Sequence, residues 1–455
     1  MKCYDVIVIG SGGGTKLVRP CADLGLKVAI IEKGPLGGTC LNRGCIPSKM
    51  LIHTADVATT IRSAHRFDLQ LEGAIKTNFK NLISRVNHTI SVDSKSIAPI
   101  YEKHPNIDLY TGPGHFLADH IVEVGGEKLT AEKIFVGIGT RPAIPSIEGL
   151  ESTPYMTSEE ALTSENQPKK LLVIGAGYIA CELGYFFGAL GTDVHFIVRS
   201  ELLRKEDKDI RTAFSNSFKK RYTIHEGLIP VKVQHANGQF SLTCQDLQKA
   251  PTVLKGDALL VVTGVTPWTD QVGIENTTIE LDEQGYIRVN DYLQTTAPGV
   301  YALGDCIGRY LFRHSVNFEG EHLFRTLFKK KKPEPITYPP MPHAVFSHPQ
   351  VAGVGLTEDA CIEQGIDYFV GINQYADSAM GMALRSEEGL VKLIFERRSQ
   401  KLIGAHILGE EASDMIHMLI AFMTMGATLS DLLKMIYIHP ALPEVVRNAA
   451  RKAIP

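Results

Sequence analysis

The sequence of 455 residues has no long hydrophobic run, a single tryptophan and no excess of charge of either sign. Because no stretch of 18 apolar residues is present, a membrane-spanning helix is not expected. The net charge of −3 gives no electrostatic basis for binding nucleic acid, and the lysine run 329–332 is expected to be a solvated loop. The chain enters an apolar strand at "MKCYDVIVIG", so we expect no signal or transit peptide.

Cysteine is also sparse, with eight residues, of which six stand singly and far apart. Without a secretion signal this pattern is typical of a reducing cytoplasm, where a working disulfide is usually catalytic, and we expect a cytoplasmic protein. Zinc sites need a second Cys/His pair at ligand spacing, and the sequence has none, so no metal site is expected. The hydrophobic content of 44% and the 21% of charged residues are those of an ordinary globular protein with room for about three domains.

The exception is "GGTCLNRGCIPSKM", residues 37–50, in which Cys40 and Cys45 stand five residues apart. The two could be a metal pair, two buried thiols without a role, or a dithiol that forms a disulfide. In a regular helix their Cα atoms would be about 8–9 Å apart, whereas a disulfide needs less than about 7 Å. The bond therefore requires a distorted segment, for which Gly44 and Pro47 supply the means. Because so short a loop gains little stability from a bridge, exchange chemistry is favoured, and it needs an electron source.

A dinucleotide site is indicated by the N-terminal segment, which reads as strand, glycine turn, helix and strand. Gly10 and Gly12 follow one apolar run, and Glu32 ends the next. The glycines let the backbone approach a pyrophosphate at a helix N-terminus, and the acid can bind the ribose hydroxyls. Thr15 stands at the third glycine position of the usual GxGxxG pattern, but the complete unit around it still predicts a site.

A second unit of this kind follows at residues 169–204. Its glycine turn fits GxGxxA, through Gly175, Gly177 and Ala180. Here the second strand ends at Val198 instead of an acid, and Arg199 and Arg204 follow. Arginine accommodates the 2′-phosphate of NADP, where an acid would hold a 2′-hydroxyl. The alternative is that both arginines are ordinary surface charges.

Two dinucleotide sites and one dithiol suggest an electron route from nicotinamide through flavin to disulfide. The dithiol closely follows Glu32 in the sequence and so belongs to the first unit, which should hold the flavin. The unit that carries the arginines should hold the exchanging nicotinamide.

The whole chain resembles the pyridine nucleotide-disulfide oxidoreductases, on segments spread from end to end. Near the N-terminus, "GGTCLNRGCIPSK" is similar to the redox-active segment of that family. The segments "VGIGTRPAIP" (136–145) and "GVYALGDC" (299–306) resemble the crossover out of the flavin domain and the second flavin motif. Finally, "MPHAVFSHPQVAGVGLTE" (341–358) and "IHPALPEVVRNAA" (438–450) resemble the start of the interface domain and its catalytic end.

The resemblance implies a role for each matching residue. Cys40 would attack the substrate disulfide, and Cys45 would face the flavin as a thiolate. His439 would be the acid and base, oriented by Glu444, and Lys49 would pair with Glu182. The implied FAD contacts are Gly10, Gly12, Gly14, Glu32, Lys49, Gly114, Gly139, Thr140 and Asp305. The implied NADPH contacts are Gly175, Gly177, Ala180, Glu182, Arg199, Arg204 and Gly264.

The chemistry of exchange supports the role of His439 independently. The reaction needs a thiolate to attack and a proton for the leaving thiol. An imidazole with a pKa of about 6.5 can serve both needs, and a carboxylate such as Glu444 usually fixes its tautomer. In this family the histidine comes from the other subunit, which implies a homodimer with shared active sites.

The fold implied is α/β, with two Rossmann-like dinucleotide-binding domains and a C-terminal α+β dimerisation domain. Glycine motifs and prolines set the expected boundaries. The FAD domain would comprise residues 1–147 and 266–337, the NAD(P)H domain residues 148–265, and the interface domain residues 338–455.

The predicted function is reduction of a small-thiol disulfide, mycothione- or glutathione-like, by an NADPH-dependent flavoprotein. The alternatives are a dihydrolipoamide dehydrogenase that uses NAD, and a flavin-bound redox sensor without turnover. The thiol itself and the physiological direction of electron flow are left open. Val265, where the family often has arginine, and Thr15 indicate a divergent branch.

Overall fold

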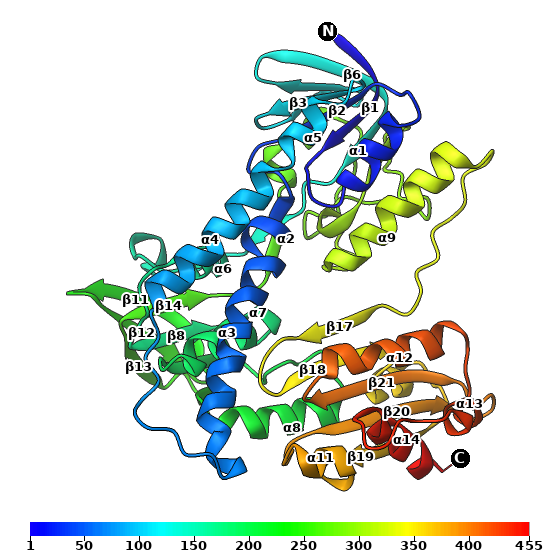
Figure 1. The fold of residues 1–455 in the computed structure, drawn as a ribbon. Coiled ribbons are helices and arrows are strands. Elements are labelled where there is room, and N and C mark those ends of the chain that lie inside the picture. The colour runs from blue at the N-terminus through cyan, green and yellow to red at the C-terminus, as the bar shows by residue number, and fades with distance from the viewer. Residues whose placement is uncertain (455) are drawn as a thin grey trace. The chain divides into compact units, whose positions relative to one another are not determined.

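Apolar runs that end in glycine turns form the parallel strands of two separate sheets, and the largest antiparallel sheet lies near the C-terminus (Figure 1). The structure is a computed structural model and describes residues 1–454. The chain divides into two units, one of residues 1–48, 80–143 and 264–337, the other of residues 49–79, 144–263 and 338–455. The predicted α/β class is confirmed.

The sheet of the first unit has the strand order β3-β2-β1-β6-β5-β4, with β16 also paired to β6. Its strands are β1 (Lys2–Ile9), β2 (Val28–Glu32), β3 (Ile107–Thr111), β4 (His115–Ala118), β5 (Ile121–Val124), β6 (Glu127–Val136) and β16 (Val300–Ala302). All pairings among β1, β2, β3, β6 and β16 are parallel. The apolar residues 6–9 of β1 are buried, as befits a central strand covered on both faces.

The helices of this unit are α1 (Thr15–Ala22), α2 (Gly38–Arg43), α4 (Phe79–Lys95), α5 (Ala98–Glu102) and α9 (Arg313–Phe324). Helices α1 and α9 pack together, and Lys16 of α1 pairs with Glu321 of α9 at 2.8 Å. A short antiparallel pair joins β7 (Thr140–Pro142) to β15 (Val265–Pro267). This pairing explains why residues 264 and 265 fall in the first unit, slightly before the boundary expected from the glycine motifs.

The second unit contains a parallel sheet with the order β10-β9-β8-β14. Its strands are β8 (Lys170–Ile174), β9 (Asp193–Val198), β10 (Thr223–Glu226) and β14 (Ala258–Val261), and the helices beside them are α3 (Cys45–Ser63), α6 (Ser158–Thr163), α7 (Tyr178–Ala189) and α8 (Lys208–Lys219). An antiparallel meander of β11 (Ile229–Ala236), β12 (Gln239–Gln245) and β13 (Pro251–Gly256) covers part of this sheet. Phe240 and Leu242 of the meander share a buried cluster with Leu172, Ile174 and Ile197 of the sheet.

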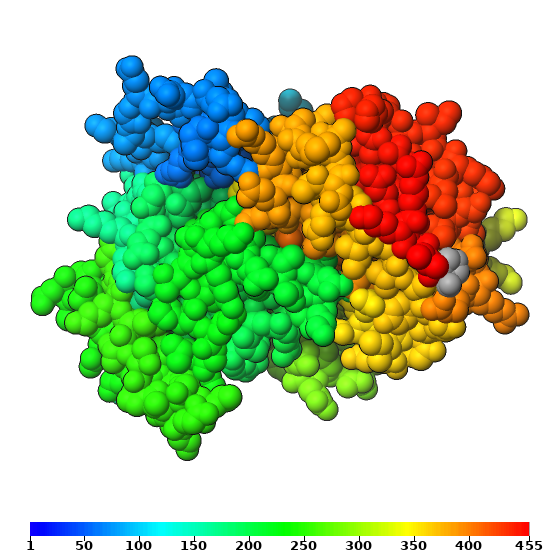
Figure 2. All heavy atoms as spheres, turned by 90° about the horizontal axis from the view of Figure 1, so that it is seen from below, coloured from blue at the N-terminus to red at the C-terminus, as the bar shows by residue number. Residues whose placement is uncertain are grey.

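The same unit includes a C-terminal sheet with the order β17-β18-β21-β20-β19, antiparallel throughout. Its elements are β17 (Pro342–Val345), β18 (Gln350–Gly355), α10 (Glu358–Glu363), β19 (Tyr368–Gln374), α11 (Ala379–Ala383), β20 (Leu390–Glu396), β21 (Leu402–Gly409), α12 (Ala412–Thr424), α13 (Leu429–Lys434) and α14 (Pro443–Lys452). Helices α12 and α14 bury its apolar face. Figure 2 shows green residues of the parallel-sheet part lying directly against yellow and orange residues of this C-terminal part. Within residues 1–454, no helix combines the length and apolar character needed to cross a bilayer.

Candidate active site

The first glycine turn connects β1 to α1 and leaves no space for side chains at three of its positions, Gly10, Gly13 and Gly14. Gly10 has φ of +100°, and a Cβ there would lie 2.3 Å from the carbonyl oxygen of Gly137. A Cβ at Gly13, which the sequence motif did not single out, would lie 1.9 Å from Cγ2 of Val316 in α9. At Gly12, by contrast, the nearest atom to a Cβ is 3.9 Å away, so the backbone is open on that side. A tightly packed turn with one open face fits the approach of a pyrophosphate.

Glu32 ends β2 beside this turn. Its Oε2 accepts hydrogen bonds from the backbone N–H and the hydroxyl of Ser11, at 2.8 and 2.7 Å, and its Oε1 accepts one from the N–H of Gly34. Thr15, at the position of the missing glycine, bonds through its hydroxyl to the carbonyl of Gly12 at 2.9 Å and begins α1. The departure is therefore accommodated within the turn.

The remaining predicted FAD residues of the first unit follow neighbouring strands of one sheet. Gly114 follows β3, Gly139 and Thr140 follow β6, and Asp305 follows β16. Because these strands are parallel to β1, their carboxyl ends meet at one edge, which is where open α/β sheets bind ligands. Asp305 accepts a hydrogen bond from Thr140 at 3.2 Å, and burial raises the pKa of this carboxyl group.

Trp268 is a feature of this edge that the sequence reasoning missed. Its indole N–H donates to the carbonyl of Thr140 at 3.1 Å. The Nζ of Lys33, the residue after Glu32, lies 3.1 Å from the ring centroid, and the guanidinium carbon of Arg141 lies 4.8 Å from it. Burial and the charge of Arg43 lower the pKa of Lys33. The single tryptophan thus links the Glu32 end of the sheet edge to the Thr140 end.

Replacing Glu32 by alanine is expected to weaken FAD binding about 10- to 100-fold, since charge-assisted hydrogen bonds contribute about 1.5–3 kcal/mol. FAD titration of the deflavinated protein, followed by Trp268 emission, measures the change. Glu127→Ala, which removes an exposed carboxylate of the same unit at the amino end of β6, opposite the carboxyl ends of the strands, serves as the control and should bind FAD like the wild type. Equal affinity in Glu32→Ala and wild type would remove Glu32 from the flavin site.

The two cysteines of the predicted dithiol lie at a break between two helices. Helix α2 ends at Arg43, Gly44 has φ of −143° and ψ of −114°, and α3 begins at Cys45. The segment is therefore distorted at Gly44, as a disulfide over this spacing requires. The side chains of Cys40 and Cys45 are hydrogen-bonded to each other, and this contact together with burial raises the pKa of Cys40.

The second glycine turn connects β8 to α7 in the same way as the first. Gly175 has φ of +149°, and a Cβ there would lie 2.5 Å from the carbonyl oxygen of Val262, whereas Gly177 has open space around it. Ala180 is fully buried in the first turn of α7. Arg199 and Arg204 follow β9, and both are exposed, without a hydrogen-bond or ion-pair partner among residues 1–454. Gly264, predicted to contact the same cofactor, has φ of +125° and belongs to the first unit.

The predicted Lys49–Glu182 pair is present in the second unit. Nζ of Lys49, about one turn into α3, lies 2.6 Å from Oε2 of Glu182 in α7. The other oxygen of Glu182 accepts the backbone N–H of Phe346 at 3.0 Å, and the Lys49 ammonium lies 4.5 Å from the centroid of that phenylalanine ring. The carboxylate of Glu182 is mostly buried and is compensated by a cation and an N–H donor.

His439 and Glu444 lie together at the start of α14. Nδ1 of His439 donates to Oε2 of Glu444 at 3.0 Å, so in the neutral ring Nε2 carries the lone pair that can accept a proton. The side chain of His439 is 71% exposed. Glu444 is buried and also accepts from Arg447 at 2.8 Å, a partner that the sequence reasoning missed. Burial raises the pKa of Glu444, but the hydrogen bond from His439 and the charge of Arg447 outweigh it and hold the pKa below its ordinary value.

Comparison with known proteins identifies the family of almost the whole chain. Residues 4–324 match the family described as "Pyridine nucleotide-disulphide oxidoreductase", and residues 341–450 match its dimerisation domain. Mycothione reductase of Mycobacterium tuberculosis is 35% identical over 461 residues, covering 99% of both chains. Dihydrolipoyl dehydrogenase of Chlorobaculum tepidum is 33% identical over 470 residues, covering 99% of this chain and 97% of the relative. The HOCl-induced flavoprotein disulfide reductase RclA from Escherichia coli has a similar structure, with a TM-score of 0.87, 27% identity and 99% coverage of both chains.

The chain belongs to the pyridine nucleotide-disulphide oxidoreductase family. It is therefore an oxidoreductase of the class that acts on sulfur groups of donors. The family is FAD-dependent and takes electrons from NAD(P)H, which agrees with the two glycine turns. The C-terminal sheet with α10–α14 is the dimerisation domain of the family.

Proposed function

We propose that this protein uses NADPH to reduce a small-thiol disulfide of the mycothione or glutathione kind, through FAD and the Cys40–Cys45 dithiol. FAD is assigned to residues 1–147 and 266–337, NADPH to residues 148–265, and dimer formation to residues 338–455. The observation that carries the proposal is the Cys40–Cys45 pair at the helix break, combined with membership of a flavoprotein family. The scattered cysteines favour a cytoplasmic location.

The chemistry proposed for the cysteines is stepwise exchange. The FAD held by the first glycine unit would supply transfer of two electrons from NADPH to the disulfide, which opens to one thiol and one thiolate. We propose that the thiolate is on Cys45, as in the family resemblance, and that Cys40 keeps its proton, in agreement with the raised pKa that its contact with Cys45 gives it. Cys40 then needs a base before it can attack a substrate disulfide, and Nε2 of a histidine can supply one.

The second half of the exchange returns that proton. When the Cys40 thiolate attacks the substrate, a Cys40–substrate mixed disulfide forms and one substrate thiolate leaves, taking the proton from the imidazolium of His439. The Cys45 thiolate then attacks the sulfur of Cys40, which restores the Cys40–Cys45 disulfide and expels the second substrate sulfur as a thiolate, and this thiolate takes its proton from solvent. Two thiols are formed for each NADPH consumed.

We assign His439 and Glu444 to the active site of the partner subunit. Two exposed isoleucines support this assignment, because Ile436 and Ile438 expose 95% and 81% of their surfaces beside His439. Apolar side chains of this size in water are typical of a surface that a second chain covers. Their place in the dimerisation domain supports coverage by a second copy.

The use of NADPH is supported by the end of β9, where Val198 is followed by two arginines that have no hydrogen-bond or ion-pair partner in the described part of the chain. Each guanidinium can form charge-assisted hydrogen bonds with a 2′-phosphate, at about 1.5–3 kcal/mol per bond before discounting for exposure. We therefore expect NADPH to be preferred over NADH by about two orders of magnitude in kcat/KM. Replacing Arg199 and Arg204 together by alanine should erase most of that ratio by weakening NADPH, with little change for NADH.

One steady-state series with a permissive disulfide or quinone acceptor measures the ratio of kcat/KM for NADPH to that for NADH, in the wild type and in the double variant. Lys205→Ala, which removes an exposed cation from the same loop, is the matched control and should keep the preference. A wild-type preference for NADH would favour the second candidate, a dihydrolipoamide dehydrogenase. The 33% identity to a dihydrolipoyl dehydrogenase over the full length supports this candidate.

A further inference from the structure

The loop that carries Arg199 and Arg204 runs from the end of β9 to the start of α8. Leu202 and Leu203 in its middle are buried, while the two arginines point into solvent. The N–H of Leu203 donates to the carbonyl of Ala176 in the second glycine turn at 2.8 Å. The loop is therefore attached directly to the backbone that is proposed to hold the dinucleotide.

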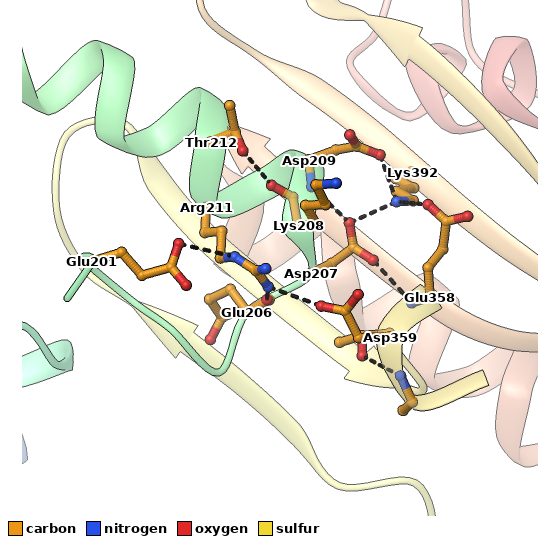
Figure 3. A network of polar contacts seen from close by, with 12 residues as sticks. Glu201, Glu206, Asp207, Lys208, Asp209, Arg211, Thr212, Glu358, Asp359 and Lys392 are labelled. Atoms are coloured by element: carbon orange, nitrogen blue, oxygen red, sulfur yellow. Dashed lines mark hydrogen bonds and ion pairs between the residues drawn. The ribbon is translucent and has the colours of Figure 1, made fainter. Parts of the chain in front are cut away.

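The loop ends at Asp207, a fully buried residue that caps α8 through the N–H of Asp209. Asp207 Oδ1 accepts from Nζ of Lys392 in β20 at 2.7 Å, and its Oδ2 accepts the backbone N–H of Glu358 at 3.1 Å. Lys392 also pairs with Asp209 at 2.5 Å and with the carboxylate of Glu358 (Figure 3). The end of the arginine loop is thus bonded to two residues of the dimerisation domain.

The charges of this cluster explain why Lys392 is essential to its geometry. The carboxylates of Asp207, Asp209 and Glu358 lie within 4.8 Å of one another, an arrangement that could hold a metal ion. Here the ammonium of Lys392, whose side chain is 0% exposed, bonds to all three. Burial lowers the pKa of Lys392, but the hydrogen bonds that its ammonium donates to the three carboxylates outweigh this effect and raise the pKa. The cation is therefore supplied by the chain, and the buried Asp207 depends on it.

A second set of contacts holds the residue before Asp207. Glu206 is buried and accepts from the hydroxyl of Tyr178 at 2.5 Å and from Nε2 of His343 in β17 at 2.7 Å. Tyr178 is the first residue of α7, directly after Gly177 of the glycine turn. Glu206 thus connects the arginine loop, the glycine turn and the dimerisation domain.

Arg211 in α8 also holds the arginine loop in place (Figure 3). Its guanidinium donates to the backbone carbonyl of Glu206 at 3.0 Å and pairs with Glu201 of the loop at 3.2 Å and with Asp359 at 3.1 Å. Its side chain is 17% exposed, so these pairs are shielded more than surface pairs are.

We propose that the dimerisation domain positions the arginine loop for the dinucleotide, with Lys392 as the main positioning residue and Arg211 as the second. The proposal rests on the proposed function, in which Arg199 and Arg204 bind the 2′-phosphate. Neither positioning residue is assigned a contact with the cofactor; each fixes the backbone from which the arginines extend. Loss of either should weaken binding through the 2′-phosphate more than binding of the common part of the dinucleotide.

A matched control exists at the opposite end of α8. Glu388 of the dimerisation domain accepts from Ser217 at 2.7 Å and pairs with Lys220 and Arg221, each at 2.9 Å. Glu388→Gln breaks ion pairs between the same two parts of the chain, at the end of the same helix, but does not touch the arginine loop. It separates positioning of the loop from general attachment of the domains.

The test is calorimetric titration of the flavin-loaded enzyme with NADP⁺ and with NAD⁺, for wild type, Lys392→Met, Arg211→Gln and Glu388→Gln. Lys392→Met should raise the dissociation constant for NADP⁺ about tenfold, since small misplacements of binding groups are costly, and should change that for NAD⁺ much less. With saturating NADPH, kcat should stay within about twofold of wild type, because only binding is affected. Glu388→Gln should match the wild type in all these values.

Arg211→Gln keeps the Asp207–Lys392 pair and should show the same pattern at about threefold, so it carries the test if Lys392→Met does not fold. If the wild type prefers NADP⁺ and the folded variants bind NADP⁺ as tightly as it does, Lys392 and Arg211 do not position the loop. The proposed function would be unaffected by that result. Equal losses in Glu388→Gln would also refute it, in favour of general domain attachment. A wild type that binds NAD⁺ and NADP⁺ equally would instead refute the role of Arg199 and Arg204.

Discussion

Replacing Cys40 by serine is expected to lower disulfide reduction at least about 10⁴-fold, because the attacking sulfur is removed and no other group can take its place. Cys45→Ser should lose as much, since the mixed disulfide on Cys40 can no longer be resolved. Steady-state turnover with a small-thiol disulfide measures both. Cys3→Ser, which changes an exposed cysteine away from the helix break, is the control and should turn over like the wild type.

The absorbance spectrum distinguishes the two roles within the pair. With NADPH added, the wild type and Cys40→Ser should develop a long-wavelength band from a thiolate at Cys45 beside the flavin, and Cys45→Ser should not. Both variants should bind FAD normally. If both kept wild-type disulfide reduction, the dithiol would have no part in catalysis, and absence of the band in the wild type would favour a flavin-bound sensor.

The second large effect is expected at His439. Replacing it by alanine should reduce disulfide turnover about 10²- to 10⁴-fold, the usual contribution of a general acid and base. Reduction of bound flavin by NADPH should be unaffected, because that step does not use the imidazole. The pKa of Glu444 is held below its ordinary 4.5, so its carboxylate stays ionised at neutral pH and keeps the imidazole of His439 oriented.

Mixing inactive chains tests whether His439 acts across the dimer. A dimer of one His439→Ala chain and one Cys40→Ser chain contains one complete site if the histidine serves the partner, and none if it serves its own chain. Random exchange of equal amounts makes half of the dimers hybrid, so roughly a quarter of wild-type activity should return. Each variant incubated alone provides the control, and no recovery after proven exchange would place the site within one chain.

The local features of the site could be predicted because their signals are local. The spacing of the glycines in the sequence identifies each glycine turn. Only glycine fits at Gly10 and Gly175, because a Cβ there would collide with a neighbouring carbonyl oxygen. The break between α2 and α3 followed from the distance that two cysteines five apart must close. The pairing of His439 with Glu444 spans a single turn of chain and was likewise predictable.

The long-range features were not predictable, because no local pattern encodes them. Trp268 contacts Lys33 only because of the fold, since the two residues are 235 positions apart in the sequence. The sequence does contain one sign of the buried Lys392, which is the only lysine within the apolar strand "LVKLIFE". Its three carboxylate partners, however, lie in other segments of the chain. Gly13 was passed over because its neighbour, Val316, comes from a distant helix.

The carboxylate of Glu182 has a consequence for protein engineering. It bonds at once to Lys49 of the helix that begins with Cys45 and to the backbone of Phe346 at the start of the dimerisation domain. A corresponding segment transplanted from a relative would bring its own side chain to this position. A chimaera that replaces residues 148–265, the proposed NAD(P)H domain, must therefore carry a carboxylate at position 182, or both recipient segments lose the group that joins them.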